Sequence, residues 1–392
     1  MDKSTGQTLD PRELFKINCF NSFMQWNIWD FPKNLFVLID EKTRNLFFNE
    51  MYQKFGSQRQ YALFLKKDRT SIQGYHYARN WNNGNRYIKF IPLQVLHKSL
   101  PFMQKETKEK IEKSIIEIRT QGGKSIENPI LPVVESPSFY RIVAHLIGDG
   151  NDSHTPYYAN TCNELRVQFE NDLQTLGKID YSETNLEATP CVNFPKVVTR
   201  ILRYILKVKF TYPNKIPERI FKASYECKSA FLQALFDDEG TISTNLAIGM
   251  SQLRIIKEIK KLLKYFAIET GIITPTNYLT KRGIKQKFAF NINKKSYLTF
   301  CKKINFSHPK KVIDLKSKIK TQTRKERTRP KQYFNEEILN ILKIGPSGSL
   351  NIADKLELTL SGLRPHLDRL YQEGKIFKKG YKNKIIWHRF MV

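Results

Sequence analysis

Two short segments of this chain share one pattern, in which an apolar helix runs directly into an acidic residue followed by glycine. The segments span Ile142–Gly150 and Leu232–Gly240, and their final acids are Asp149 and Glu239, 90 residues apart. Acidic side chains are normally kept away from buried apolar stripes. A carboxylate at the end of such a stripe, twice in one chain, therefore predicts two acids that meet at an interface and hold a cation.

An internal duplication surrounds the two acids. We expect two units, about 136–210 and 211–310, each with the order α-β-β-α-β-β-α. In the first unit we expect helices over 137–149, 163–176 and 194–206, and strands near 155–159, 178–181 and 189–192. In the second unit we expect helices over 227–239, 253–268 and 295–304, and strands near 241–243, 246–250, 272–279 and 287–292.

The charge of the chain points to a polyanionic partner. Its 392 residues carry 66 Lys+Arg against 37 Asp+Glu, a formal net charge of +29. Such a charge produces a long-range positive field whose usual partner is nucleic acid, with a membrane surface as the competing partner. No apolar run of about 18 residues and no signal peptide is found. We therefore expect a cytoplasmic, nucleoid-associated protein with no membrane partner.

Cysteine and histidine usage excludes other site chemistries. The five cysteines are scattered without a CxxC pair, as expected for reduced thiols in a cytosolic protein. The seven histidines show no HxxxH or HxH spacing, which argues against a zinc site and against an HNH-type nuclease.

Residues 1–103 are assigned to an N-terminal helical domain. Helices expected over 45–55, 58–67 and 70–79 have the outline of a helix-turn-helix module. The third helix would direct Arg79 toward DNA, together with Gln73, His76 and Tyr77. An ordinary helical bundle is the alternative. Residues 104–135, a charged helix followed by glycines and spaced prolines, are interpreted as a linker.

The C-terminal part is predicted to add a second DNA-binding unit. Residues 311–332 form a strongly basic linker, suited to solvent or to phosphate contact. Residues 333–392 read as three helices followed by a basic hairpin, which resembles a winged helix-turn-helix. Its third helix would present Arg364 and Arg369, and its hairpin Lys379 and Lys382.

The acid–glycine pattern suits phosphodiester hydrolysis. This reaction needs an activated water and a stabilised leaving oxygen, and a divalent ion supplies both. Mg²⁺ prefers oxygen ligands and keeps several waters, so one or two carboxylates for each site suffice. Glycine after the acid lets the chain turn sharply out of the helix. Small residues such as Ala144 and Ala234 allow the two helices to pack closely, which would bring both acids beneath the DNA backbone.

These residues resemble the LAGLIDADG motifs of homing endonucleases, closely in Phe231–Gly240 and well in Ile142–Gly150. The resemblance covers about 136–310 and implies an α+β fold: a duplicated αββαββα endonuclease domain with pseudo-twofold symmetry, here flanked by the helical domain and the winged helix. Two saddle-shaped sheets would lie along the major groove of double-stranded DNA, and one chain would act as a monomer. In that family the last acid of each motif and the carbonyl before it bind Mg²⁺, for which Mn²⁺ can substitute. The matching ligands are Asp149, Glu239 and the carbonyls of Gly148 and Asp238.

The chain departs from the family pattern at several positions. Ile147 replaces the first acid of the motif, which Asp237 keeps, and Gln233 stands where a small residue is usual. The family also uses a basic residue in each half to assist the water. Lys287 or Lys285 matches in the second half, with Lys287 preferred for catalysis and Lys285 for DNA contact. The first half offers no lysine over 189–194, which predicts one weaker cleavage site.

Three functions are compatible with this sequence. The leading hypothesis is a freestanding, site-specific double-strand DNA endonuclease of the homing type, because the chain lacks the terminal residues of an intein. A non-catalytic DNA-binding regulator on a retired endonuclease core is the second hypothesis, and an RNA-splicing maturase the third. Two ligand-competent acids favour the enzyme, and two helix-turn-helix candidates favour duplex DNA over RNA.

Overall fold

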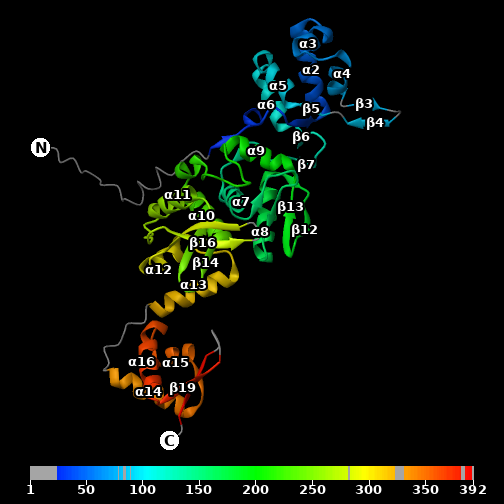
Figure 1. The fold of residues 1–392 in the computed structure, drawn as a ribbon. Helices are drawn as coiled ribbons and strands as arrows, with labels where there is room; N and C mark the ends of the chain where they lie inside the picture. Colours follow the sequence, from blue (N-terminus) through cyan, green and yellow to red (C-terminus); the bar gives the residue numbers. More distant parts are fainter. Residues whose placement is uncertain are drawn as a thin grey trace, which may run out of the picture. The chain divides into compact units, whose positions relative to one another are not determined.

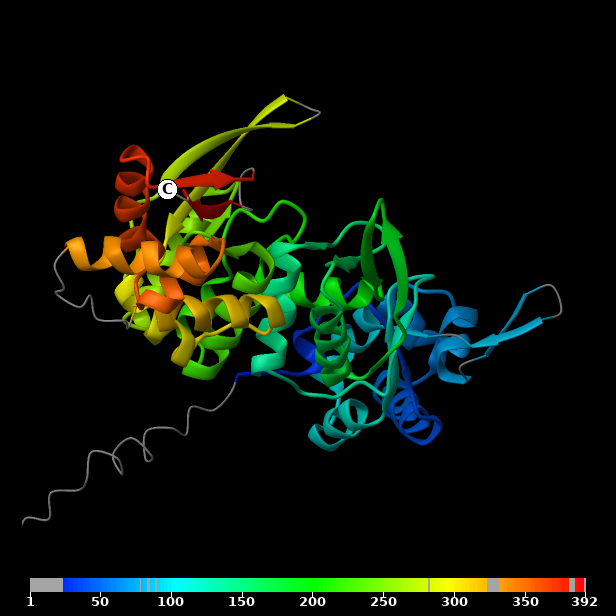
Figure 2. The ribbon, with the colours of Figure 1, turned by 90° about the horizontal axis from the view of Figure 1, so that it is seen from below.

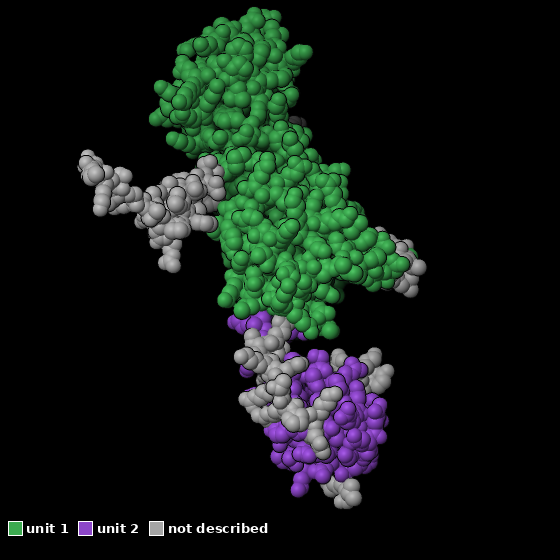
Figure 3. All heavy atoms as spheres, turned by 90° about the vertical axis from the view of Figure 1, so that its left-hand side faces the viewer, with its two compact units in different colours: residues 1–311 green, residues 312–392 purple. Residues whose placement is uncertain are grey.

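A computed structural model describes residues 24–77, 79–82, 85–88, 90–280, 283–322, 331–380 and 385–390. The chain divides into two compact units, residues 1–311 and 312–392 (Figure 3). Both combine helices with antiparallel strands, consistent with the α+β class. Across the described ranges, no helix has the length and apolarity needed to cross a bilayer.

The N-terminal part of unit 1 packs helices against a five-stranded sheet with the order β11-β7-β6-β2-β5. The strands are β2 (Phe36–Ile39), β5 (Ile91–Pro92), β6 (Ile115–Arg119), β7 (Ser125–Glu127) and β11 (Lys178–Ile179). The helices are α2 (Glu41–Phe55), α3 (Gln58–Leu65), α4 (Arg69–Tyr77), α5 (Leu93–Ser99) and α6 (Lys105–Lys113). Local capping sets their starts: Asp40 accepts from the Thr43 amide at 2.9 Å and Ser57 from the Gln60 amide at 3.2 Å.

The proposed third helix of the helix-turn-helix module differs from expectation. α4 ends at Tyr77, and Arg79 begins β3 (Arg79–Asn82), which pairs with β4 (Asn85–Ile88). Arg79 is therefore not on that helix. His76 is buried and stacks on Phe48, with ring centroids 5.0 Å apart, so aromatic packing takes it out of reach of DNA.

Residues 104–135 are folded rather than extended as a linker. They contain α6, and β6 and β7 pair within the five-stranded sheet. β8 (Val133–Val134) pairs with β1 (Gln25–Trp26). The glycines that suggested a linker instead form the tight turn between β6 and β7, where Gly122 has a φ of 68°.

Two helix–sheet assemblies make up the rest of unit 1 (Figure 1). The first contains α7 (Pro137–Gly148), β9 (Gly150–Asn151), β10 (Tyr157–Ala159), α8 (Asn163–Leu173), β12 (Ser182–Leu186), β13 (Thr189–Asn193) and α9 (Lys196–Leu206). The second contains α10 (Tyr225–Glu239), β14 (Gly240–Ile242), β15 (Leu246–Met250), α11 (Leu253–Tyr265), β16 (Thr274–Thr280), β17 (Gly283–Asn291) and α12 (Tyr297–Lys303). We call them the α7 assembly and the α10 assembly.

The two sheets have the same strand order. Read from the strand that follows the helix, the orders are β9-β10-β13-β12 and β14-β15-β17-β16, and the described pairings are antiparallel. α8 packs on β13, and α11 packs on β15 and β17. The strand expected near 178–181 is β11, which leaves the α7 assembly and joins the five-stranded sheet instead.

α7 and α10 pack against each other more extensively than any other two described elements. Ser136 accepts from the Phe139 amide at 3.1 Å and Ser224 from the Cys227 amide at 3.2 Å, so each helix starts at a serine cap. Both helices are buried over most of their length. They bring their C-terminal ends to one place in unit 1.

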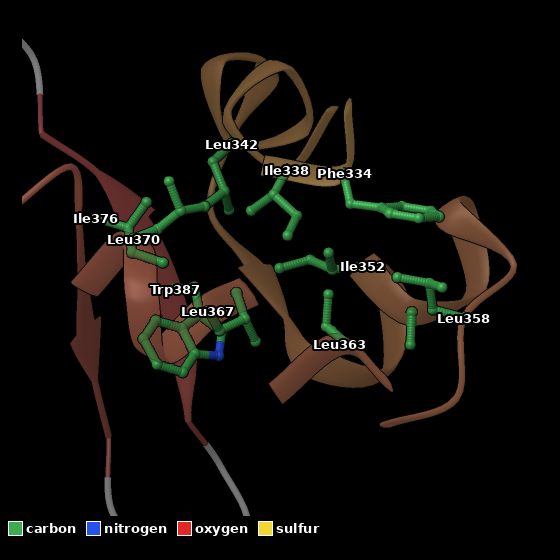
Figure 4. Packing of buried hydrophobic residues seen from close by; sticks show 11 residues of the cluster. Phe334, Ile338, Leu342, Ile352, Leu358, Leu363, Leu367, Leu370, Ile376 and Trp387 are labelled. Atoms are coloured by element: carbon green, nitrogen blue, oxygen red, sulfur yellow. The ribbon is translucent and has the colours of Figure 1, made fainter. Parts of the chain in front are cut away.

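Unit 2 is a small helical unit with a three-stranded sheet. It contains α14 (Lys331–Ile344), β18 (Ser347–Gly348), α15 (Ser349–Leu356), α16 (Leu360–Gln372), β19 (Ile376–Lys379) and β20 (Ile386–Arg389), in the strand order β18-β20-β19. Its own apolar core holds these elements together, with Ile338, Ile352, Leu363 and Ile376 fully buried (Figure 4). α13 (Pro309–Gln322) occupies part of the segment expected to be a basic linker.

Candidate active site

Asp149 and Glu239 lie where α7 and α10 end. Asp149 is the residue that follows the last turn of α7, and its amide donates to the His145 carbonyl at 3.1 Å. Glu239 is the last residue of α10. A Cβ at the next residue, Gly150 or Gly240, would collide with the backbone one turn earlier in the helix. Glycine is therefore required after each acid, because each strand begins in direct contact with its own helix.

The two acids share one electrostatic environment. Burial raises the pKa of both Asp149 and Glu239 to about 7. The charges of Asp238 and Glu239 further raise the pKa of Asp149, whereas Lys287 and Lys311 lower that of Glu239. The Asp149 side chain still reaches solvent at the end of α7. Because each of these carboxylates stands in a cluster of like charges, a bound cation would relieve the repulsion.

The Asp238 side chain is held by the other assembly. Its carboxylate is fully buried and accepts from Tyr158 Oη at 2.8 Å and from Asn160 Nδ2 at 3.2 Å. It also pairs with His145 Nδ1 at 2.9 Å. Burial lowers the pKa of His145, but the carboxylates of Asp238, Asp237 and Asp172 together raise it above its ordinary value. The carboxylate of Asp238 is thus occupied by hydrogen bonds within the protein.

Lys311 is a site residue that the sequence did not reveal. Its Nζ donates to the carbonyls of Phe236 at 3.1 Å, Asp237 at 2.5 Å and Gly240 at 2.7 Å, where α10 ends. Burial lowers the pKa of Lys311, and the surrounding acids oppose that shift. A cation at a helix C-terminus offsets the helix dipole and satisfies free carbonyls. In the sequence this lysine is only one of many in a basic run.

Asp237 joins the same end of α10 to the start of α13. Its carboxylate accepts from the Ser307 amide at 3.0 Å and the His308 amide at 3.0 Å. Burial raises its pKa to about 6, and these hydrogen bonds oppose the shift. Asp237 therefore supports the chain that carries Lys311.

A cleft of about 340 Å³ opens beside Glu239. Its lining includes Gly148 and Gly150 at the end of α7, and Lys287 on β17. The stem of Lys287 passes over Gly249, where an added Cβ would lie 2.7 Å from Lys287 Cε. Lys285 lies on the same strand, is exposed and is not among the residues that line this cleft.

The remaining predicted DNA contacts fall on other elements. Arg364 and Arg369 are exposed on α16, and Arg364 has an ion pair of 3.9 Å with Asp368. Lys379 is exposed at the end of β19, and Lys382 lies outside the described residues. Gly148, another predicted ligand, contacts Asp238: an added Cβ would lie 2.8 Å from its Oδ2.

The donor set fits Mg²⁺ or Mn²⁺. Within the described ranges, no three or more His, Cys, Asp or Glu side chains gather as a metal site. Mg²⁺ needs only one or two carboxylates, because water and substrate phosphate complete its shell. The crowded Asp149 and Glu239 carboxylates provide that number.

Comparison with known proteins finds likenesses only among solved structures. No family model and no curated protein matches the chain. The homing endonuclease I-DmoI in complex with DNA and Ca is 13% identical, with a TM-score of 0.34, over 47% of this chain and 98% of that one. I-WcaI bound to its DNA recognition sequence is 12% identical, with a TM-score of 0.31, over 47% and 88%.

A third structure matches a longer part of the chain. WhiA from T. maritima is 13% identical, with a TM-score of 0.35, over 63% of this chain and 93% of that one. These structures comprise LAGLIDADG homing endonucleases and WhiA. At such TM-scores the likenesses assign no residue and no activity to this chain.

Proposed function

We propose that this protein is a site-specific, metal-dependent DNA endonuclease of the homing type, built from two LAGLIDADG repeats. One observation carries the proposal. Two tightly packed helices end in the acids Asp149 and Glu239, each acid is followed by a glycine that the fold requires, and Asp149 responds to the charge of Glu239. An ordinary helix-terminal acid stands alone, whereas the charge of Glu239 acts on Asp149, and Glu239 lines a cleft together with Gly148 and Gly150, the residues on either side of Asp149.

Some of these residues would bind the metal ion, and others would orient the water or hold the site in place. Asp149, Glu239 and the carbonyls of Gly148 and Asp238 would hold Mg²⁺, or Mn²⁺ in its place. When bound, such an ion lowers the pKa of a water and stabilises the leaving oxygen of the phosphodiester. Lys287 shares the cleft with Glu239 and would orient the attacking water or stabilise charge on the phosphate. Lys311 holds the end of α10 in place.

The charge of the chain and its exposed basic residues support binding to duplex DNA. Its net charge of +29 favours phosphate contact. Lys285 is exposed on β17, and unit 2, as a winged helix, would place Arg364 and Arg369 of α16 in a groove, with Lys379 and Lys382 near the backbone. Because both acids belong to one chain, a monomer can make the site. We place its activity in the cytoplasm, at the nucleoid.

A DNA-binding regulator without cleavage activity is the second candidate. It is favoured by one observation: the α7 assembly has no lysine where the α10 assembly has Lys287. The two candidates share DNA binding and differ in catalysis.

The deciding experiment uses the duplex made by joining the sequences that flank the open reading frame or its intron, as in an uninserted allele. With Mg²⁺ or Mn²⁺ the purified protein should cut this duplex at one position. Asp149→Asn and Glu239→Gln should abolish cutting and retain binding, whereas Glu218→Gln should change neither, since that side chain is 81% exposed in a surface turn.

Binding should weaken steeply with added salt, because lysines displace counterions. Binding without cutting in both metals would instead support the regulator. Absence of binding would contradict both candidates.

A further inference from the structure

The loop that joins the two assemblies displays an exposed aromatic residue. Tyr212 lies between α9 and α10, has a φ of 52°, and is 81% exposed. A positive φ is uncommon for a bulky side chain, and it persists only where the surroundings enforce it. Hydrophobic burial does not enforce it here, since the ring is in solvent.

A buried carboxylate holds the two residues that precede Tyr212. Asp152 is 6% exposed and accepts from the Phe210 amide at 3.2 Å and from the Thr211 amide at 2.9 Å. It also accepts from the Thr211 hydroxyl and forms an ion pair with Arg203 at 3.3 Å. Asp152 follows Asp149 by three residues, so the loop is tied to the segment that leaves the acid.

The loop forms one wall of the cleft beside Glu239. Phe210, Tyr212 and Pro213 line this cleft together with Met250. Glu239 and Lys287 line it too. The cleft therefore combines apolar and charged walls. A nucleotide has the same two-sided chemistry, because its base has an apolar face and its phosphate is charged.

We propose that Tyr212 is a DNA-positioning residue, whose ring packs on a base or deoxyribose next to the phosphate that Glu239 and Lys287 serve. This inference rests on the proposed function. Asp152 supports this contact by holding the amides of Phe210 and Thr211, which directly precede Tyr212. An aromatic ring supplies sequence-tolerant contact, since every base has a π-face.

The test measures binding and cutting of the uninserted-allele duplex by Tyr212 variants. Tyr212→Ala should weaken binding without metal about ten-fold, as expected for loss of one aromatic–base contact. Tyr212→Phe should stay within about two-fold, because it keeps the ring. In the parent protein, 5-iodouracil placed near the cut should form a photo-crosslink to Tyr212.

A glycine variant separates DNA contact from folding. Tyr212→Gly removes the ring and also the strain of a positive φ. It should therefore lose as much affinity as Tyr212→Ala while its melting temperature stays equal or rises. Tyr204→Ala is the control, because Tyr204 is 54% exposed on α9 and is not among the residues that line the cleft.

The outcomes distinguish this inference from the proposed function. A parent protein that binds and cuts, with Tyr212→Ala and Tyr212→Gly unchanged, would overturn the inference and leave the endonuclease standing. A parent protein that binds but does not cut, with the Tyr212 variants weakened, would support the contact and overturn the endonuclease. A parent protein that does not bind DNA would overturn both.

Discussion

The α7 and α10 assemblies each have an acid at the corresponding position, Asp149 and Glu239, and differ in the cation beside that acid. Tyr158 pairs with Val192 and Ile248 with Phe290, and three residues before these partners stand Thr189 and Lys287. Lys287 is thus present in one assembly, and its counterpart is a threonine. Paired acids do not guarantee paired catalytic environments.

Hairpin length accounts for this difference. The β12–β13 hairpin ends at the Leu186–Thr189 pair, directly before its turn. The β16–β17 hairpin continues past the Thr276–Lys287 pair to Thr280–Gly283, and Figure 2 shows it in yellow, projecting from the sheet. Strand on both sides of Lys287 therefore fixes its direction toward Glu239, whereas a lysine at 189 would stand at a turn.

The junction between the assemblies is asymmetric as well. At corresponding motif positions, α7 has His145 and Gly148 where α10 has Leu235 and Asp238. Asp238 reaches into the α7 assembly, and Gly148 makes room for it.

Breaking the buried pair should cost the most stability. His145→Leu places in α7 the residue that α10 has, and it leaves Asp238 buried without its cation. We expect the free energy of unfolding to fall by about 3–5 kcal/mol in urea denaturation. His154→Leu, at an exposed position, is the control.

The double variant His145→Leu/Asp238→Gly makes the two helices alike at these positions. It should lose clearly less than the sum of the two single variants, because no buried charge is left unpaired. Additive losses would show that the two side chains do not act as a pair.

Removal of Lys287 from the cleft should slow the cleavage of one DNA strand. In Lys287→Met, the strand served by Glu239 should be cut about 100-fold more slowly, with little change in the other strand. Single-turnover assays with each strand labelled in turn measure this. Lys285→Met, beside it on β17, should affect binding and salt dependence only. Equally slowed cleavage of both DNA strands would contradict the assignment of Lys287 to the Glu239 side alone.

Loss of the close approach between α7 and α10 should have a smaller effect on stability. In Gly148→Ala the new methyl would lie 2.8 Å from Asp238 Oδ2 and 2.9 Å from its Cβ. We expect a loss of about 2 kcal/mol in the free energy of unfolding. Gly345→Ala meets no atom within 4 Å and should unfold like the parent protein. A harmless Gly148→Ala would mean that the helices tolerate a wider spacing.

The smallest effect is a pH dependence of stability without metal. Between their ordinary pKa values of 3.8 and 4.5 and the folded values of about 7, Asp149 and Glu239 bind more protons when folded than when unfolded. Stability from these groups is therefore complete below about pH 4 and is lost as the pH rises through 7.

Melting temperatures across this range, with Mg²⁺ absent, measure that loss. Asp149→Asn and Glu239→Gln should each flatten the decline. Lys287→Met should extend it to higher pH, because Lys287 lowers the pKa of Glu239. An unchanged profile in all three variants would contradict the raised pKa values.

Local signals explain which parts of the fold were predictable. The helices at 137–148, 225–239 and 360–372 start at Ser136, Ser224 and Thr359, whose side chains cap the first turn. The β14–β15 hairpin follows from its alternating residues and short turn. These features depend on neighbours within a few residues. Non-local pairing decided the rest: β6, β7 and β11 found partners in a distant sheet, so 104–135 was not a linker.

By itself, the sequence determined that two acid–glycine motifs stand 90 residues apart in a strongly basic chain. Only the tertiary structure decided which carboxylates remain open. Asp238 pairs with His145, 93 residues away, and Asp237 accepts from the amides before α13, which leaves Glu239 beside the cleft and Asp149 exposed at the end of α7. The physical reason is that a buried carboxylate is stable only with partners, and those partners come together only when the chain has folded.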